Sequence, residues 1–171
     1  MAVTGKAGSV QVLDSRRVVI ADTRAPGANQ PYHFAEKLEL GAAEKHLESC
    51  AAISERLALS AIGDVVKELK GYEITGAAVV LASERQLPSL PDILRSHALI
   101  HTAEGEFFRR VVRQACEKLG IVVTGIRERE LGEGSALQLE IAGLGKTVGP
   151  PWTQDQKMAA LAAMMVLSDA Q

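Results

Sequence analysis

Long hydrophobic runs and a surplus of cysteine are both missing from this sequence. No apolar stretch reaches the roughly 20 residues that a membrane-spanning helix needs, and residues 1–8 lack the apolar centre of a secretory signal peptide. The two cysteines, Cys50 and Cys116, each fall within an apolar helical pattern. We therefore expect buried free thiols in a reducing compartment, and hence a cytoplasmic protein that does not contact a membrane.

An excess of one charge and a rich supply of aromatic residues are missing as well. The formal net charge of −2 excludes broad, sequence-independent attraction of polyanions, although a local basic face remains compatible with it. What the chain does contain is 47% apolar residues over 171 positions, enough for one domain that buries roughly two thirds of its unfolded surface. We expect that domain over residues 9–171, after a flexible tail at residues 1–8.

Apolar, β-branched runs predict the strands. The first three form a meander that is followed by two separate strands, and the five predicted segments are residues 10–14, 18–23, 32–40, 77–82 and 121–126. The run at residues 77–82 is continuously apolar, as is typical of a strand covered on both faces.

Three- and four-residue apolar spacing predicts the helices. They are expected at residues 42–70, 92–100, 102–119 and 137–144, and from Thr153 to the end of the chain. In the helix from Thr102, the stripe Phe108, Val112, Ala115 and Leu119 is expected to face the sheet. Thr153 and Gln156 have the spacing of a capping box.

The resulting element order is β-β-β-α-β-α-β-α, which predicts an α/β protein with a mixed five-stranded sheet and helices on both faces. Parallel neighbours need crossover connections of fixed hand. Residues 10–14 should therefore occupy the centre, antiparallel to residues 18–23 and parallel to residues 77–82.

Acidic residues follow the ends of these predicted elements. Asp14 ends the first strand, Glu84 follows the strand at residues 77–82, and Asp155 lies in the first turn of the last helix. If the three carboxylates converge, they supply the oxygen ligands that Mg²⁺ prefers. Asp22 is an alternative first ligand. Each acid also has a structural explanation, as a turn residue, a solvated loop acid and a helix N-terminal acid respectively.

This order of elements, with an acid on the first strand, resembles the ribonuclease H-like superfamily, and within it the RuvC type of Holliday-junction resolvase. Three segments carry the resemblance: residues 10–16 (VQVLDSR), 79–84 (VVLASE) and 155–162 (DQKMAALA). The resemblance implies that Asp14, Glu84 and Asp155 bind Mg²⁺ or Mn²⁺ and catalyse two-metal phosphodiester hydrolysis.

A second group of candidate ligands follows the predicted loop at residues 86–91. His97 and His101 are four residues apart, and Glu104 follows three residues later. On one helix, this spacing places two imidazoles on the same face and adds a carboxylate. However, Thr102 looks like a helix start, which would separate the histidines. The alternative is that one histidine packs or caps and the other is exposed.

Basic residues supply candidates for binding nucleic acid. Arg109 and Arg113 share a helical face, and Lys146 lies further along the chain. Such residues contact phosphates and position nucleic acid without specifying its sequence. The alternative is a solvated helix face on which the arginines alternate with acids such as Glu106.

Two functional hypotheses follow. The first is a Mg²⁺- or Mn²⁺-dependent nuclease that acts on branched DNA or an RNA–DNA hybrid, with a homodimer as a compatible assembly. The second is a catalytically inactive ribonuclease H-like interaction protein. The second is favoured by the low aromatic content, the slightly acidic balance, and the departures from the family pattern at Ser15-Arg16 and Met158.

Overall fold

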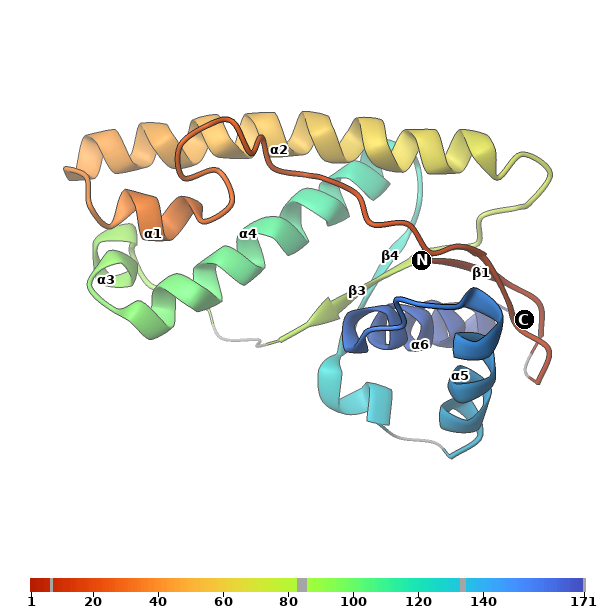
Figure 1. The fold of residues 1–171 in the computed structure, drawn as a ribbon. Helices are drawn as coiled ribbons and strands as arrows, with labels where there is room; N and C mark the ends of the chain where they lie inside the picture. Colours follow the sequence, from red (N-terminus) through yellow and green to blue (C-terminus); the bar gives the residue numbers. More distant parts are fainter. Residues whose placement is uncertain (7, 83–85, 133–134, 171) are drawn as a thin grey trace. The chain divides into compact units, whose positions relative to one another are not determined.

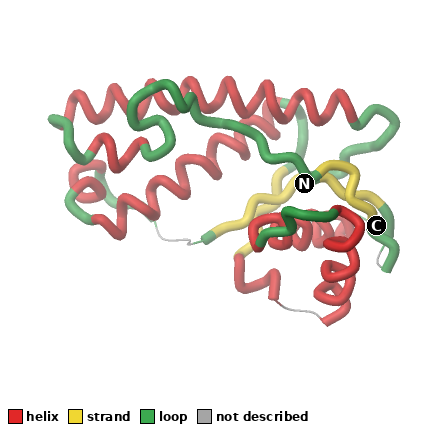
Figure 2. The backbone as a smooth tube through the Cα atoms, in the orientation of Figure 1, coloured by secondary structure: helices red, strands yellow, loops and turns green. Residues whose placement is uncertain are grey.

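The computed structural model describes residues 1–6, 8–82, 86–132 and 135–170. Helices make up most of the regular structure, and the strands are short (Figure 2). The strands are β1 (Ala2–Thr4), β2 (Gln11–Asp14), β3 (Ala77–Leu81) and β4 (Val123–Arg127). The helices are α1 (Pro31–Ala35), α2 (Leu40–Glu68), α3 (Leu90–Leu94), α4 (His97–Lys118), α5 (Ser135–Val148) and α6 (Gln154–Asp169), with a short 3-10 helix at Glu128–Gly132.

The chain divides into two compact units, each assembled from separate segments, where the sequence predicts one domain. Unit 1 comprises Met1–Arg17, Val65–Ala82 and Gly120–Gln171, and unit 2 comprises Val18–Asp64 and Ser83–Leu119. Unit 1 therefore holds all four strands with α5 and α6, whereas unit 2 holds α1, α3, α4 and most of α2 (Figure 1).

The predicted ribonuclease H-like five-stranded sheet is wrong. Across the described parts of the chain, β2 pairs antiparallel with β1, and β3 pairs parallel with β4, in two separate two-stranded sheets. Residues 10–14 do contribute a strand, but its hydrogen-bonded neighbour is β1, formed by residues that the sequence predicts to be a flexible tail. The parallel strands β3 and β4 overlap two of the predicted strands, residues 77–82 and 121–126.

Two predicted strands adopt other structures for local reasons. Residues 18–20 have no regular structure, and the chain then turns at Asp22, whose carboxylate accepts a hydrogen bond from the backbone amide of Arg24 at 3.0 Å. Residues 32–40 belong to α1, the loop after it and the first residue of α2. Pro31 at the start of α1 suits a helix, because its ring presets φ and it has no amide hydrogen to satisfy.

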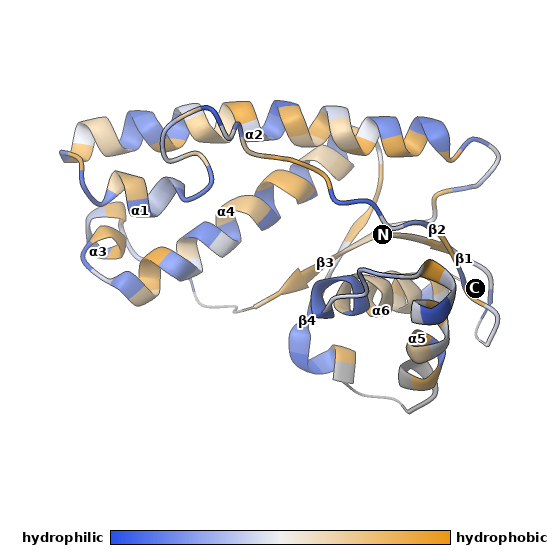
Figure 3. Cartoon of the chain, in the orientation of Figure 1, coloured by the Kyte–Doolittle hydropathy of each residue, from blue (hydrophilic) through white to orange (hydrophobic). Residues whose placement is uncertain are grey.

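The long helix α2 confirms the amphipathic pattern and continues through Gly63 without a break. Its fully buried positions all carry small side chains, namely Ala43, Cys50, Ser54, Ala58 and Gly63. Cys50 and Ala58 share a buried cluster with residues of α4. Figure 3 shows hydrophobic and hydrophilic residues alternating along both helices, as expected for helices that bury one face.

Helix α4 begins at His97, five residues before the predicted start, and its buried stripe is displaced by one residue. Phe107 is 3% exposed, whereas Phe108 is only half-buried. Ile100, Ala103, Val111 and Ala115 continue the buried stripe. Among the four residues predicted to face a sheet, Ala115 alone is fully buried, and it packs in a cluster with residues of α2.

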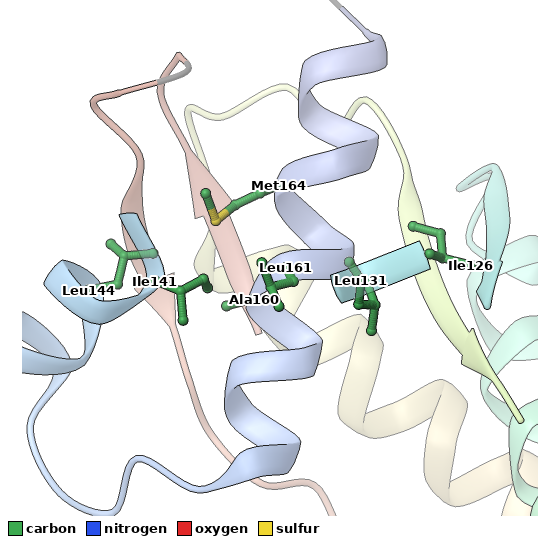
Figure 4. Packing of buried hydrophobic residues seen from close by; sticks show 8 residues of the cluster. Ile126, Leu131, Ile141, Leu144, Ala160, Leu161 and Met164 are labelled. Carbon is green, nitrogen blue, oxygen red and sulfur yellow. The ribbon is translucent and has the colours of Figure 1, made fainter. Parts of the chain in front are cut away.

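The core of unit 1 forms around α6, which packs against β1 and β3. Ala160 and Ala162 are small enough for close packing beside Leu161 and Met164, and Ile126, Leu131, Ile141 and Leu144 complete the cluster (Figure 4). The capping box predicted for this helix is confirmed by reciprocal bonds between Thr153 and Gln156. In the described residues, no helix combines the length and apolar character needed to cross a membrane.

Candidate metal centre

The histidine pair of the sequence pattern lies on one helix, because α4 starts earlier than Thr102. Ser96 is the N-cap residue, and its side chain accepts a hydrogen bond from the amide of Leu99 at 3.4 Å. Thr102 does not cap a helix. Its hydroxyl donates to the carbonyl oxygen of Ala98 at 3.0 Å, a bond typical of threonine inside a helix. His97 and His101 are therefore one turn apart on the same face.

A third histidine, His33 of α1, joins this pair within unit 2. Ligand atoms of the three imidazoles all lie within 4.8 Å of one another. The ring centroids of His33 and His101 are 4.7 Å apart, and those of His97 and His101 are 4.5 Å apart, each pair in an edge-to-face arrangement. His97 and His101 are exposed and His33 is half-buried, so an ion can reach the cluster from solvent.

Glu104 fixes α1 against α4 at this place. Its Oε1 accepts hydrogen bonds from the backbone amides of Tyr32 and His33, both at 3.2 Å, and its Oε2 is 2.8 Å from Nδ1 of His33. Amides in the first turn of a helix have no partner within the helix, and an acidic group there also complements the helix dipole. The side chain of Glu104 is only 12% exposed, so these bonds are sheltered from water.

The contact with Glu104 also determines which nitrogen of His33 is available. When Nδ1 donates its hydrogen to the carboxylate, Nε2 carries the lone pair and is the nitrogen that can bind a metal. A histidine that binds metal through one nitrogen and donates to a carboxylate through the other is a recurring arrangement in metal sites.

The packing beneath the cluster keeps its supporting helices in place. Ile100 is 0% exposed and Ala103 is 1% exposed, and both pack with Ile93 of α3 in a small core that Tyr32 also contacts. His97 and His101 belong to the same helix, α4, as Ile100 and Ala103. Tetrahedral zinc requires ligand nitrogens about 3.3 Å apart, given bonds of about 2.0–2.1 Å. The nitrogens of the three histidines lie within 4.8 Å of one another, so zinc binding in this geometry requires the imidazoles to move closer together.

The predicted carboxylate site of Asp14, Glu84 and Asp155 stays a prediction. Glu84 lies outside the described residues. In the remainder of the described chain, the three histidines form the single group of at least three metal-binding side chains, and neither Asp14 nor Asp155 belongs to it. Asp14 accepts a 2.8 Å hydrogen bond from the backbone amide of Arg16 and forms an ion pair with the guanidinium of the same arginine at 2.6 Å. Asp155 is exposed at the start of α6.

Asp22, the alternative ligand, belongs to unit 2 and serves a turn. Its carboxylate accepts hydrogen bonds from the backbone and the side chain of Arg24, and these bonds hold the pKa of Asp22 below its usual value. The arginine keeps this carboxylate charged but also engages both of its oxygens.

The predicted basic residues belong to different units. Arg109 and Arg113 lie on α4 in unit 2, and Lys146 is exposed on α5 in unit 1. Arg109 forms an ion pair with Glu106 at 3.0 Å. The arginines and acids that alternate on α4 therefore form at least one ion pair, Arg109 with Glu106.

The remaining histidine, His46 on α2, is placed differently from the cluster. Its ring lies 4.6 Å from that of Phe34, and its Nε2 is 3.5 Å from the sulfur of Cys50. Burial raises the pKa of the Cys50 thiol, which disfavours the thiolate that metals require. His46 thus provides an internal comparison for the three clustered histidines.

Sequence reasoning identified His101 and Glu104 as candidates but missed the contribution of His33. The spacing of His97, His101 and Glu104 was a usable signal, whereas His33 lies in a segment predicted to be a strand, more than 60 positions earlier in the chain. Comparison with protein-family models, with curated proteins and with solved structures gives no match to this chain.

Proposed function

We propose that this protein binds a divalent transition-metal ion, with Zn²⁺ as the first candidate, through His33, His97 and His101. The observation that carries the proposal is the convergence of three imidazoles from two helices, one of them oriented by a sheltered carboxylate. Three histidines leave a fourth tetrahedral position for water or a ligand, which is the composition of catalytic rather than closed structural zinc sites.

The chemistry of the ligands favours zinc over magnesium. Imidazole suits Zn²⁺, Cu²⁺, Ni²⁺ and Fe²⁺, whereas Mg²⁺ and Mn²⁺ prefer carboxylate and carbonyl oxygens. An ion with an open position acts as a Lewis acid and lowers the pKa of a water molecule that it binds. The proposed role is therefore metal-dependent binding or hydrolytic activation of a small ligand at the surface of unit 2.

Nuclease activity with Mg²⁺ at Asp14, Glu84 and Asp155 stays a prediction of the sequence. The predicted sheet, at whose strand ends that prediction placed Asp14 and Glu84, is contradicted, so the geometric argument for their convergence with Asp155 no longer holds. The histidine cluster carries the stronger proposal because its ligands are close together in the structure itself.

The absorption spectrum of Co²⁺ tests the proposed site. Cobalt replaces zinc in tetrahedral sites, and its visible bands report both coordination number and ligand type. We expect intense visible bands when one equivalent is added to the wild-type protein, as is typical of tetrahedral coordination. The bands should persist in His46→Ala and disappear in His101→Ala. Weak bands typical of octahedral cobalt in the wild type would contradict the proposed coordination.

A second test concerns Glu104. Glu104→Gln preserves the size of the side chain but exchanges a charged acceptor for a neutral amide, so His33 loses its strongest orienting contact. Loss of a residue that hydrogen-bonds to a metal-binding histidine typically lowers metal affinity by about 10–100-fold. We expect a decrease in zinc affinity in that range, measured by competition with a chromophoric chelator. Glu106→Gln, two residues further along the same helix, should leave zinc affinity within about twofold.

A further inference from the structure

Helix α1 is held in unit 2 by its neighbours and not by its own length. It has five residues, and an isolated helix shorter than about 12–15 residues is marginal in water. In the structure it contacts α3 and α4 (Figure 1). Pro31 and Ala35, at its two ends, are buried, and Tyr32 packs against both apolar clusters that include residues of α4. The docked helix therefore covers apolar surface that would face water if α1 moved away.

Tyr32 and His33 attach α1 to α4. The backbone amides of both residues donate to one carboxylate oxygen of Glu104, each at 3.2 Å. The ring of Tyr32 also meets that of Phe107 edge-to-face, with 6.3 Å between the ring centroids. The position of α1 on α4 therefore depends on the same residue, His33, that supplies one imidazole to the histidine cluster.

The three histidines of the proposed metal site are divided between these two helices. His33 belongs to α1, whereas His97 and His101 belong to α4. The ring centroid of His33 lies 5.4 Å from that of His97 and 4.7 Å from that of His101. With α1 docked, an ion can bind three imidazoles, and with α1 away from α4 it can bind only the two on α4. The docked state therefore binds the ion more tightly.

From this division we infer that metal binding controls the docking of α1: the bound ion holds α1 on α4, and loss of the ion loosens it. The inference rests on the proposed metal site. A ligand shifts an equilibrium by the difference in its affinity for the two states, and the coupling is reciprocal. Losing a residue that hydrogen-bonds to a metal ligand lowers metal affinity by about 10–100-fold, and losing the ligand itself should lower it by more.

Glu104 connects the ion to the backbone of α1. Its Oε2 lies 2.8 Å from Nδ1 of His33, while its Oε1 accepts the two amides of α1. A cation on Nε2 withdraws electron density from the imidazole, which makes the hydrogen on Nδ1 a stronger donor to the carboxylate. The side chains of His33 and Glu104 are only 19% and 12% exposed, so water weakens this bond little. Metal binding thus strengthens an existing attachment as well as adding a new one.

Amide hydrogen exchange of the full chain, followed by NMR at constant pH with and without saturating Zn²⁺, tests the inference. The amide of Tyr32 exchanges when its bond to Glu104 opens, so its rate reports the population of undocked α1. Without zinc, we expect this amide to exchange faster than that of Ala115, which is 2% exposed in α4. Zinc should slow exchange at Tyr32 by about tenfold or more in the wild type.

Two variants that each keep two histidines of the cluster separate bridging from binding. His33→Ala leaves both remaining imidazoles on α4, so bound zinc no longer joins the helices. Its Tyr32 amide should exchange at the same rate, within about twofold, with and without zinc. His97→Ala leaves one imidazole on each helix. Zinc at a concentration that saturates this variant should still slow the Tyr32 amide by at least about threefold.

The outcomes separate this inference from the metal site on which it rests. Protection of Tyr32 by zinc that is as strong in His33→Ala as in the wild type would overturn the docking inference. Equal exchange rates of Tyr32 and Ala115 without zinc would also overturn it, because α1 would then open only when α4 opens. Either result leaves the metal site intact if the wild type gives the tetrahedral cobalt spectrum. Absence of that spectrum would overturn both.

Discussion

Zinc should raise the melting temperature of the wild-type protein by about 5–10 °C at a concentration 100 times the dissociation constant. An ion that binds only the folded state stabilises it by about 2.7 kcal/mol at this excess, and each kcal/mol corresponds to about 2–4 °C for a chain of this size. His97→Ala removes a direct metal ligand. The zinc affinity of this variant should therefore fall by more than the roughly 100-fold typical of losing a residue that only hydrogen-bonds to a ligand. The shift at the same zinc concentration should then shrink to about 1 °C.

The control for this experiment is His46→Ala, because His46 is the one histidine outside the cluster. Its zinc-dependent shift should match that of the wild type. Lowering the pH from about 7.5 to about 5.5 should reduce the wild-type shift, since protonated imidazole cannot bind a metal. An equal loss of the shift in His46→Ala and His97→Ala would point to nonspecific binding and contradict the account.

The largest effect on stability is expected for Phe107→Ala. Phe107 is 3% exposed and packs with Val111, Ala115 and residues of α2. Its ring also meets that of Tyr32 edge-to-face at 6.3 Å, which ties α1 to α4 next to His33. Removing a buried phenylalanine side chain typically costs about 3–5 kcal/mol in the free energy of unfolding. Urea denaturation followed by circular dichroism measures this loss.

The neighbouring residue is the matched comparison. Phe108 is half-buried, so that Phe108→Ala should cost only about 1–2 kcal/mol, in proportion to the apolar area that is already exposed. A larger loss for Phe108→Ala than for Phe107→Ala would show that the buried face of α4 is the one predicted from the sequence and not the one in the structure.

Helices with a long, regular pattern were predictable from the sequence, and isolated strands were less so. The pattern at residues 42–70 extends over many turns, and the structure contains α2 at nearly the same bounds. The segment at residues 32–40 is short, and its alternation fits a strand or a single helical turn. Helix formation there is favoured by Pro31 and by the hydrogen bonds that backbone amides of α1 donate to Glu104, a residue distant in the sequence. Local periodicity cannot report such contacts.

The sheet prediction failed for a related reason. Residues 10–14 and 77–82 each form a strand, but the choice of neighbour depends on which other segments are extended. Once residues 18–20 and 32–40 are not strands, no meander remains to place β2 in the centre, and β1 becomes its partner. Errors in two short segments therefore changed the whole topology.

Part of the candidate site could be predicted from the sequence, namely His97, His101 and Glu104, but not His33. The spacing of His97 and His101 predicts one helical face only if a single helix contains both, and the sequence analysis instead expects a helix start at Thr102. Ser96 as the N-cap residue places the helix start before both histidines, and the serine is present in the sequence as a capping signal. The approach of His33 depends on tertiary contacts between α1 and α4, which no local pattern contains.

Anomalous diffraction from crystals of the protein grown with zinc tests the central claim most directly. Data collected above and below the zinc absorption edge locate the ion without assumptions about its ligands. The account predicts one strong anomalous peak about 2.0–2.1 Å from a ring nitrogen of each of His33, His97 and His101, with Glu104 still bonded to Nδ1 of His33. A zinc peak at Asp14 or Asp155 with none at the histidines, or three histidines that remain apart with no peak between them, would contradict it.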